Sequence, residues 1–128
     1  MRIYDSNWMQ IEEYLQHDDR IVVPVGSTEQ HGYLSLGTDA ILAGRVSEEA
    51  AEPLGIPVLP TLPFGMSPYF TAYPGSMSLR MSTYIEVIRD LAVHLPAVRH
   101  LAQAVLGSPG HNLAGAELTA AIEEALVA

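Results

Sequence analysis

Hydrophobic and polar positions alternate along the chain with two different periods, which predicts helices and short strands in turn. Apolar residues at helical spacing predict helices at Trp8–Gln16, Asp39–Glu52, Thr83–Leu95 and Leu113–Val127. Apolar runs bounded by Gly and Pro predict strands at Arg20–Gly26, Ile56–Pro60 and Leu101–Leu106, with a shorter one at Met77–Leu79. Residues 61–76, rich in Pro and Gly, are expected to form a long shaped loop.

Polar residues at the helix starts supply candidate N-caps. Asn7 followed by Gln10 predicts a capping box at the first helix, and the caps expected for the other three helices are Thr38, Ser82 and Asn112. The spacing that predicts the first three helices is carried by Trp8, Ile11, Tyr14 and Leu15, then by Ile41, Leu42, Val46 and Ala50, and then by Tyr84, Val87, Ile88, Leu91 and Leu95. Pro24 favours an edge position or a strand end for its run.

The order of these elements predicts the fold class. Strands that alternate with helices favour an α/β fold with a mainly parallel sheet and helices on both faces, here as a single domain over residues 1–128. The carboxyl ends of parallel strands lie along one edge of the sheet, where sites form. The loops that begin at Gly26, Pro60 and Gly107 are therefore expected to converge.

Composition excludes several classes of function. The chain has 128 residues, is 48% hydrophobic and 16% charged, and contains no Cys, which excludes thiolate metal sites and a Cys nucleophile. All six basic residues are Arg, against 15 acidic ones, and the net charge of −9 disfavours a nucleic-acid partner. No apolar run is long enough to cross a membrane, and the first residues lack an apolar signal core. A cytoplasmic protein is expected.

The loop after the first strand carries the candidate chemistry. Glu29, His31 and Asp39 place two carboxylates and an imidazole within eleven residues, a donor set suited to Zn²⁺ and similar cations. The alternative is that Glu29 and His31 are solvated loop residues and that Asp39 only favours the helix dipole. His111 is either a further ligand or a turn residue. Without Cys or a nucleophile elbow, metal-activated water is the most economical hydrolytic mechanism.

Aromatic residues gather in the loop between residues 63 and 76. Phe64, Tyr69, Phe70 and Tyr73 lie there in a frame of Pro and Gly. They either cap the core as a packed loop, or form a wall for a small planar substrate or a subunit contact. Tyr69, Phe70 and Tyr73 are the substrate-binding candidates.

Several motifs together resemble the creatininase (creatinine amidohydrolase) family. They are Val23-Pro-Val-Gly-Ser-Thr-Glu-Gln-His-Gly32, Leu36-Gly-Thr-Asp39, Pro63-Phe-Gly-Met-Ser67 and Tyr73-Pro-Gly-Ser-Met-Ser-Leu79. The resemblance implies a three-layer α/β/α sandwich, assembly into oligomers, and hydrolysis of cyclic or linear amides with two divalent ions, Zn²⁺ or Mn²⁺. It also implies that Glu29 and His31 bind different ions and that Asp39 bridges them.

The chain departs from the family pattern in three places. The stretch Tyr33–Leu36 is one residue shorter, and Tyr69-Phe70 stands where many members have Glu-His. Gly107-Ser-Pro-Gly-His-Asn112 replaces the family's Asn-Gly-His-Gly-Gly-Asn, so Pro109 falls at the ligand position and His111 is displaced. Complete members are also about twice as long. The chain therefore resembles the amino-terminal half of a creatininase-like protein.

Two functions from different classes follow. The first is a metal-dependent amidohydrolase that cleaves a C–N bond of a small cyclic or linear amide through metal-activated water. Glu29, His31 and Asp39 form its catalytic metal site, and a homo-oligomer or a companion subunit supplies the missing half. The alternative is a non-catalytic creatininase-like half-domain that acts as an assembly or regulatory subunit, and a truncated product without a function of its own also stays open.

Overall fold

A short parallel sheet lies at the centre of the molecule. The computed structural model describes residues 1–93 and 100–105. Strand β1 (Arg20–Val25) pairs in parallel with β2 (His100–Val105), in register from the first residue of each strand to the last. The predicted strands at these two places are confirmed to within a residue. Because both strands run in the same direction, their carboxyl ends lie at the same edge.

The other edge of β1 is also paired. The backbone N–H of Val22 donates to the Pro57 carbonyl, and that of Leu62 donates to the Pro24 carbonyl, each at 2.9 Å. The predicted strand Ile56–Pro60 is present only as an extended segment with isolated bridges, because its two prolines lack the N–H that a regular ladder requires. β1 is therefore an interior strand. Of the two positions expected for Pro24, the strand end is correct and the edge is wrong.

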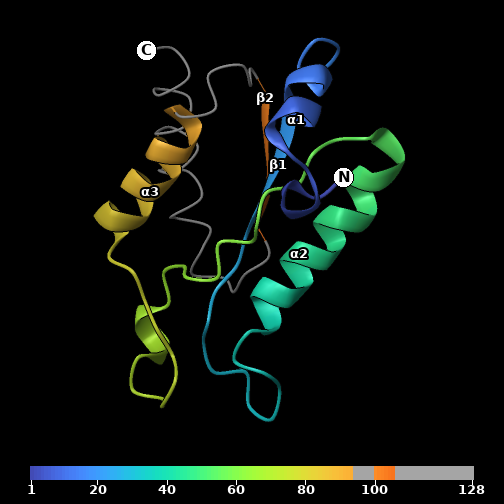
Figure 1. Cartoon of the computed structure of the whole chain (residues 1–128). Helices are drawn as coiled ribbons and strands as arrows, with labels where there is room; N and C mark the ends of the chain where they lie inside the picture. The colour runs from blue at the N-terminus through green and yellow to red at the C-terminus, as the bar shows by residue number, and fades with distance from the viewer. Residues whose placement is uncertain (94–99, 106–128) are drawn as a thin grey trace.

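Helices cover both faces of this sheet, which confirms the three-layer α/β/α class. In Figure 1, α2 (Thr38–Ala51) and α3 (Met81–Val93) lie on opposite sides of β1. Alternate β1 side chains point to alternate faces, as in any strand. The core on the α3 side contains Val23, Val25, Tyr84 and Ile88. The core on the α2 side contains Ala51, Ile56 and Val58, with Val22 packed against it.

Helix α1 (Trp8–Tyr14) begins as its sequence predicts. The Asn7 side chain accepts hydrogen bonds from the N–H groups of Met9 and Gln10, and the Gln10 side chain accepts from the Asn7 N–H, which completes a capping box. The helix ends at Tyr14 rather than Gln16. Ile11, Tyr14 and Leu15 are partly buried, whereas Trp8 is exposed.

The other caps differ from expectation. Thr38 is the first residue of α2, and the cap of this helix is Gly37. The Thr38 hydroxyl donates to the Ser35 carbonyl at 2.6 Å. Ser82 lies inside α3, which begins at Met81. In both places the predicted cap falls within the first turn, so the helix begins slightly earlier than the polar residue suggests.

Short 3₁₀ turns complete the described chain, at Ile3–Asp5, Glu52–Leu54 and Pro68–Phe70. The short strand expected at Met77–Leu79 is reduced to one antiparallel bridge between Met77 and Thr28. Leu95, Leu106, the turn at Gly107–Gly110, and the helix Leu113–Val127 with its cap Asn112 lie outside the described residues.

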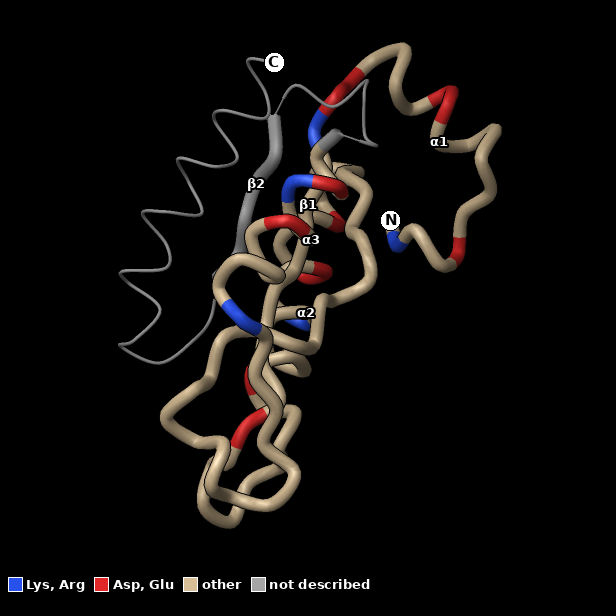
Figure 2. Tube along the Cα trace, turned by 90° about the vertical axis from the view of Figure 1, so that its left-hand side faces the viewer, with Lys and Arg blue, Asp and Glu red and all other residues tan. Residues whose placement is uncertain are grey.

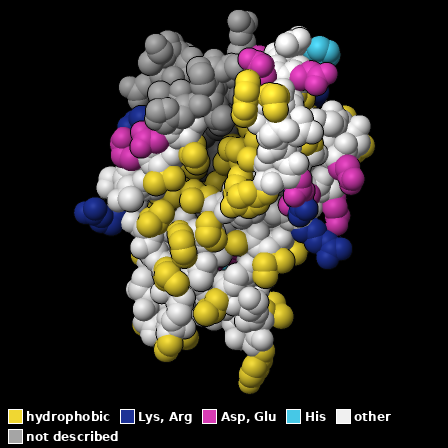
Figure 3. Space-filling model, in the orientation of Figure 1, with side chains coloured by type: hydrophobic (Ala, Val, Ile, Leu, Met, Phe, Trp, Pro, Cys, Tyr) yellow, Lys and Arg dark blue, Asp and Glu magenta, His cyan; other side chains and the backbone are white. Residues whose placement is uncertain are grey.

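The buried face of α2 is made of small residues. Ala43, Ser47 and Ala51, spaced by four, are buried against the sheet. Ile41, Leu42 and Val46, whose spacing predicts the helix, are exposed instead, with Ile41 at 60%. Hydrophobic side chains consequently reach the surface at several places in Figure 3. A face without large side chains lets the helix axis approach the sheet closely.

Charged residues form local pairs along the surface. Four ion pairs join residues close in sequence: Arg2 with Asp5, Arg20 with Asp18, Arg45 with Glu49, and Arg89 with Glu86. Figure 2 accordingly shows the basic positions separated from one another along the trace. Among the helices of the described part, none has the length and hydrophobicity that crossing a bilayer requires.

Gly26 sets the distance between β1 and α2. A Cβ atom at this position would lie 2.5 Å from the Ala40 Cα and 2.7 Å from the Ala40 nitrogen, closer than real contacts allow. Those atoms belong to helix backbone, which cannot rotate away as a side chain can. The residue after β1 therefore has to be glycine for the first turn of α2 to lie where it does.

We expect Gly26→Ala to lower the free energy of unfolding by about 3 kcal/mol or more, since overpacking against backbone costs at least the usual 1–3 kcal/mol. Urea unfolding measures the change. Gly37→Ala is the matched control, because its Cβ would lie 3.7 Å from its nearest neighbours, on Ile41 and Ser35, and its φ of −90° suits alanine. A control loss of about 1 kcal/mol at most is expected, and equal losses in the two variants would contradict the steric explanation.

Candidate metal centre

The loop between β1 and α2 brings together residues that the strand and the helix hold in place. Two backbone hydrogen bonds shape it, from Glu29 to the Leu36 carbonyl and from Leu34 to the His31 carbonyl, each at 3.0 Å. Gly32 turns the chain with a φ of +60°, a conformation that glycine adopts without strain. The loop folds back on itself, and Glu29 comes to lie near the start of α2.

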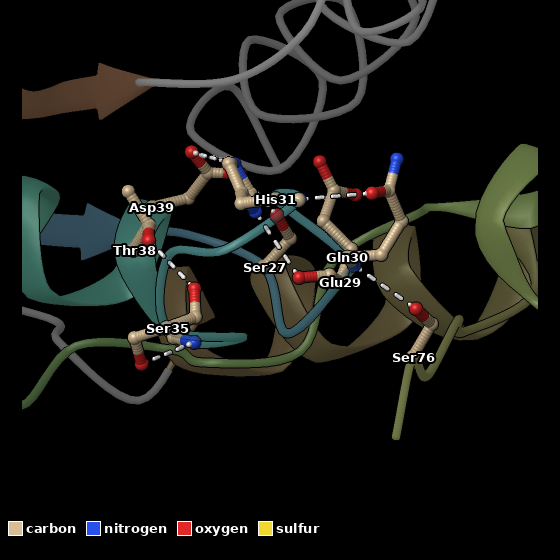
Figure 4. A network of polar contacts seen from close by, with 10 residues as sticks. Ser27, Glu29, Gln30, His31, Ser35, Thr38, Asp39 and Ser76 are labelled. Carbon is tan, nitrogen blue, oxygen red and sulfur yellow. Dashed lines mark hydrogen bonds and ion pairs between the residues drawn. The ribbon is translucent and has the colours of Figure 1, made fainter. Parts of the chain in front are cut away.

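A second loop holds the first from the side. The Thr28 hydroxyl donates to the Pro63 carbonyl at 2.8 Å, and the Gln30 N–H donates to the Ser76 hydroxyl at 3.0 Å (Figure 4). The loops that follow Gly26 and Pro60 therefore converge, as the parallel sheet predicts. The third loop, after Gly107, lies outside the described residues.

Glu29, His31 and Asp39 form one cluster. One donor atom from each residue lies within 4.8 Å of the donor atoms of the other two. Figure 4 shows the three side chains meeting above the loop, with Asp39 coming from the first turn of α2. The structure thus brings together the three residues that the sequence predicts as ligands.

The Glu29 carboxylate is buried without a partner. The residue is 2% exposed, and its Oε2 atom is buried with no hydrogen-bond partner among the residues that the structure describes. An unpaired buried carboxylate oxygen is costly, because it loses its contact with water and gains nothing in return. A cation beside it would remove that cost, so the donor set fits a divalent ion.

His31 is oriented by its own loop. Its Nδ1 lies 3.1 Å from the Glu29 carbonyl oxygen, and its Nε2 lies 3.2 Å from Asp39 Oδ1. The contact with the Glu29 carbonyl raises the pKa of His31 above its usual value, burial opposes this, and the Asp39 carboxylate adds to the rise. When Nδ1–H donates to the carbonyl, the lone pair of Nε2 faces the cluster, which is the arrangement typical of metal-binding histidines.

Asp39 does not cap the helix. Its Oδ2 accepts a hydrogen bond from the Ser27 hydroxyl at 2.6 Å, and its Oδ1 faces His31. Both oxygens therefore point toward the loop, whereas a capping side chain would accept from the N–H groups of its own helix. This arrangement goes against the alternative in which Asp39 only favours the helix dipole.

Ser27 is the residue of this cluster that sequence reasoning missed. It is 1% exposed and lies two residues beyond the end of β1. Spacing gives no signal for it, since a serine after a strand is common in loops. Its contact with Asp39 depends on how closely α2 approaches β1, which the sequence pattern does not specify.

The predicted substrate-binding residues belong to the second loop. Tyr69 and Phe70 belong to the 3₁₀ turn Pro68–Phe70, and the Phe70 and Tyr73 rings meet edge to face with centroids 6.4 Å apart. Tyr69 and Tyr73 are exposed, whereas Phe70 is partly buried, so the packed-loop and the substrate-wall interpretations both stay open. Their role in binding stays a prediction, and His111 lies outside the described residues.

Comparison with known proteins identifies the family of this chain. A family model described as creatininase, creatinine amidohydrolase, matches residues 4–126. This chain belongs to the creatininase family. The match extends beyond the stretch that carries the motifs and includes nearly the whole chain.

Curated relatives of this creatininase-family chain are hydrolases. A 3-dehydro-scyllo-inosose hydrolase of Thermotoga maritima is 35% identical over 81 residues, which are 62% of this chain and 26% of the relative. A creatinine amidohydrolase of Pseudomonas putida is 28% identical over 114 residues, which are 84% of this chain and 43% of the relative. The chain thus spans less than half the length of either relative.

Solved structures of the family share the fold. A crystal structure of creatinine amidohydrolase (creatininase) superposes with a TM-score of 0.85 at 28% identity, covering 98% of this chain and 50% of that one. Two further creatininases are similar: a manganese form, with TM-score 0.85 at 25% identity, and a mutant of Zn–Zn type, with TM-score 0.84 at 26% identity. This chain covers 51% and 50% of them, respectively, and 98% of it is matched in each case.

We expect Glu29→Gln to stabilise the protein in the presence of a chelator by about 1–2 kcal/mol, because a neutral amide is less costly to bury than an unpaired carboxylate. Urea unfolding measures the difference. Glu12→Gln, at an exposed position on α1, is the control and should change stability by no more than about 0.5 kcal/mol. If, in the presence of the chelator, Glu29→Gln is less stable than the wild type, the cost assigned to the buried carboxylate is contradicted.

Proposed function

We propose that this protein is a metal-dependent amidohydrolase that cleaves a C–N bond of a small cyclic or linear amide. One observation carries the proposal: a buried, unpartnered Glu29 carboxylate lies within reach of His31 and Asp39. The hydrolases among its curated relatives support the same reaction class.

Glu29, His31 and Asp39 are the residues proposed to hold the ion. One imidazole nitrogen and two carboxylates suit Zn²⁺ or Mn²⁺, and manganese and Zn–Zn forms of solved creatininases support this choice. A divalent ion bound there supplies two kinds of chemistry, a lower pKa for a nearby water molecule and polarisation of an amide carbonyl. Two ions, with Asp39 between them and His111 as a further ligand, complete the proposal.

The chain's own residues prepare the site in two ways. The Glu29 carbonyl accepts from His31 Nδ1–H and so keeps Nε2 turned toward the carboxylates. The aromatic residues Tyr69, Phe70 and Tyr73 are proposed to contact the substrate, since a planar amide can stack on the exposed rings of Tyr69 and Tyr73. A mutant creatininase that superposes on 98% of this chain has been solved as a complex with creatine, a small guanidino acid, which supports a small molecule as the class of substrate.

The proposed partner is another protein chain, either in a homo-oligomer or as a companion subunit. This sequence covers about half of the solved creatininases. A cytoplasmic location also stays a prediction. The alternative, a non-catalytic assembly or regulatory subunit, is less favoured because the three donors are retained and clustered.

The proposal is tested by metal analysis and hydrolysis together. We expect protein purified without added metal to contain Zn or Mn, and to release amine from members of a small-amide panel. Chelation should abolish the release and Zn²⁺ or Mn²⁺ should restore it. Glu12→Gln should behave as the wild type, and Glu29→Gln should lose the ion while keeping its fold. A wild type that binds no more Zn²⁺ or Mn²⁺ than Glu29→Gln would overturn the proposal.

Metal affinity should rise with pH. A proton on His31 Nε2 competes with the ion, and the raised pKa of His31 keeps that proton bound to a higher pH than in a free histidine. We expect Zn²⁺ to bind more weakly at about pH 6 than at about pH 8 and to release a proton. Calorimetry in buffers of different ionisation enthalpy measures this release.

His17→Gln, at an exposed histidine after α1, is the control for this measurement and should keep the same pH dependence. Affinity that does not change across this range of pH would contradict the role of His31 as a ligand.

A further inference from the structure

The position of the Asp39 carboxylate is fixed by a residue outside the donor set. The Ser27 hydroxyl donates to Asp39 Oδ2 at 2.6 Å, across twelve residues of chain. A hydrogen bond to a carboxylate at this distance is short and charge-assisted, hence stronger than one between neutral groups. Ser27 is 1% exposed, so its hydroxyl is shielded from bulk solvent.

Within residues 1–93 and 100–105, no other contact of Asp39 holds its carboxylate in the same way. The cap of α2 is Gly37, and the helix start receives no side-chain cap hydrogen bond. His31 Nε2 lies 3.2 Å from Oδ1, on the side where an ion would bind. With the His31 nitrogen committed to an ion, the Ser27 hydroxyl is the contact that remains to keep the carboxylate from rotating.

We propose that Ser27 is a positioning residue for the metal site: it holds Asp39 Oδ2 so that Oδ1 faces Glu29 and His31. This inference rests on the proposed function, because it concerns the same ion. It assigns Oδ2 as the anchored oxygen of Asp39, while Oδ1 faces His31. Loss of the hydroxyl frees the carboxylate to rotate out of this orientation, so that the donor set fits an ion less well.

The test compares two buried serines. Residues that orient a metal ligand change affinity by about 10- to 100-fold when they are removed, and we expect Ser27→Ala to weaken Zn²⁺ binding by that factor. Ser47→Ala is the matched control. Ser47 is 3% exposed and lies eight residues beyond Asp39 on α2, and its hydroxyl has no hydrogen-bond partner. The control should stay within about threefold of the wild type.

Two further readouts separate positioning from a general loss of stability. At saturating Co²⁺, the visible absorption spectrum should change in Ser27→Ala and stay as in the wild type in Ser47→Ala, because only the first alters how Asp39 meets the ion. Ser27→Thr keeps the hydroxyl and should restore the affinity and the spectrum. This second variant also serves if Ser27→Ala does not fold, as judged by thermal unfolding with chelator.

The possible failures are distinguishable. A wild type that binds neither Zn²⁺ nor Co²⁺ would overturn the proposed function, and the positioning role with it. A wild type that binds, together with a folded Ser27→Ala of unchanged affinity and spectrum, would overturn the positioning role alone. An equal loss in Ser27→Ala and Ser47→Ala would do the same, as would a Ser27→Thr protein that folds and binds as weakly as the alanine variant.

Discussion

The site depends on a contact between two pieces of backbone. Gly26 lies against Ala40 in the first turn of α2. Gly65 lies on another side of Gly26, so close that a Cβ added to Gly65 would be 2.8 Å from the Gly26 carbonyl oxygen. Three segments of chain therefore meet at the end of β1 with no side chain between them. The 2.6 Å contact between Ser27 and Asp39 requires this closeness. A larger residue at either glycine would move the helix that carries Asp39.

The cluster beside this contact opposes stability, and an ion at the proposed metal site would offset that cost. A buried carboxylate oxygen without a partner is the kind of local conflict that natural proteins keep at functional sites. Around Glu29 the chain is otherwise well bonded, since Thr28 and Gln30 are each tied to the second loop. The surrounding hydrogen bonds hold in place a group that would by itself favour moving into water. Rigidity of this kind orients donor atoms before any ion arrives.

Sequence reasoning reached the fold and the three donors for one reason: both depend on local pattern. The apolar run of β1, the capping box at Asn7 and the spacing of Glu29, His31 and Asp39 can be read from neighbouring residues. The buried face of α2 and the role of Ser27 cannot, because they depend on how near two elements approach. Small residues such as Ala43 carry little hydrophobic signal, yet they decide that approach. The prolines of the segment 56–60 likewise prevented a regular strand where the apolar pattern predicts one.

The three donors lie within eleven consecutive residues, and this has a consequence for chain entropy. Closing a loop of this length costs about 2 kcal/mol, whereas closing one as long as the stretch from Asp39 to His111 costs about 4 kcal/mol. Bringing together three donors from one strand–loop–helix unit therefore costs less loop-closure entropy than bringing together donors from remote parts of the sequence.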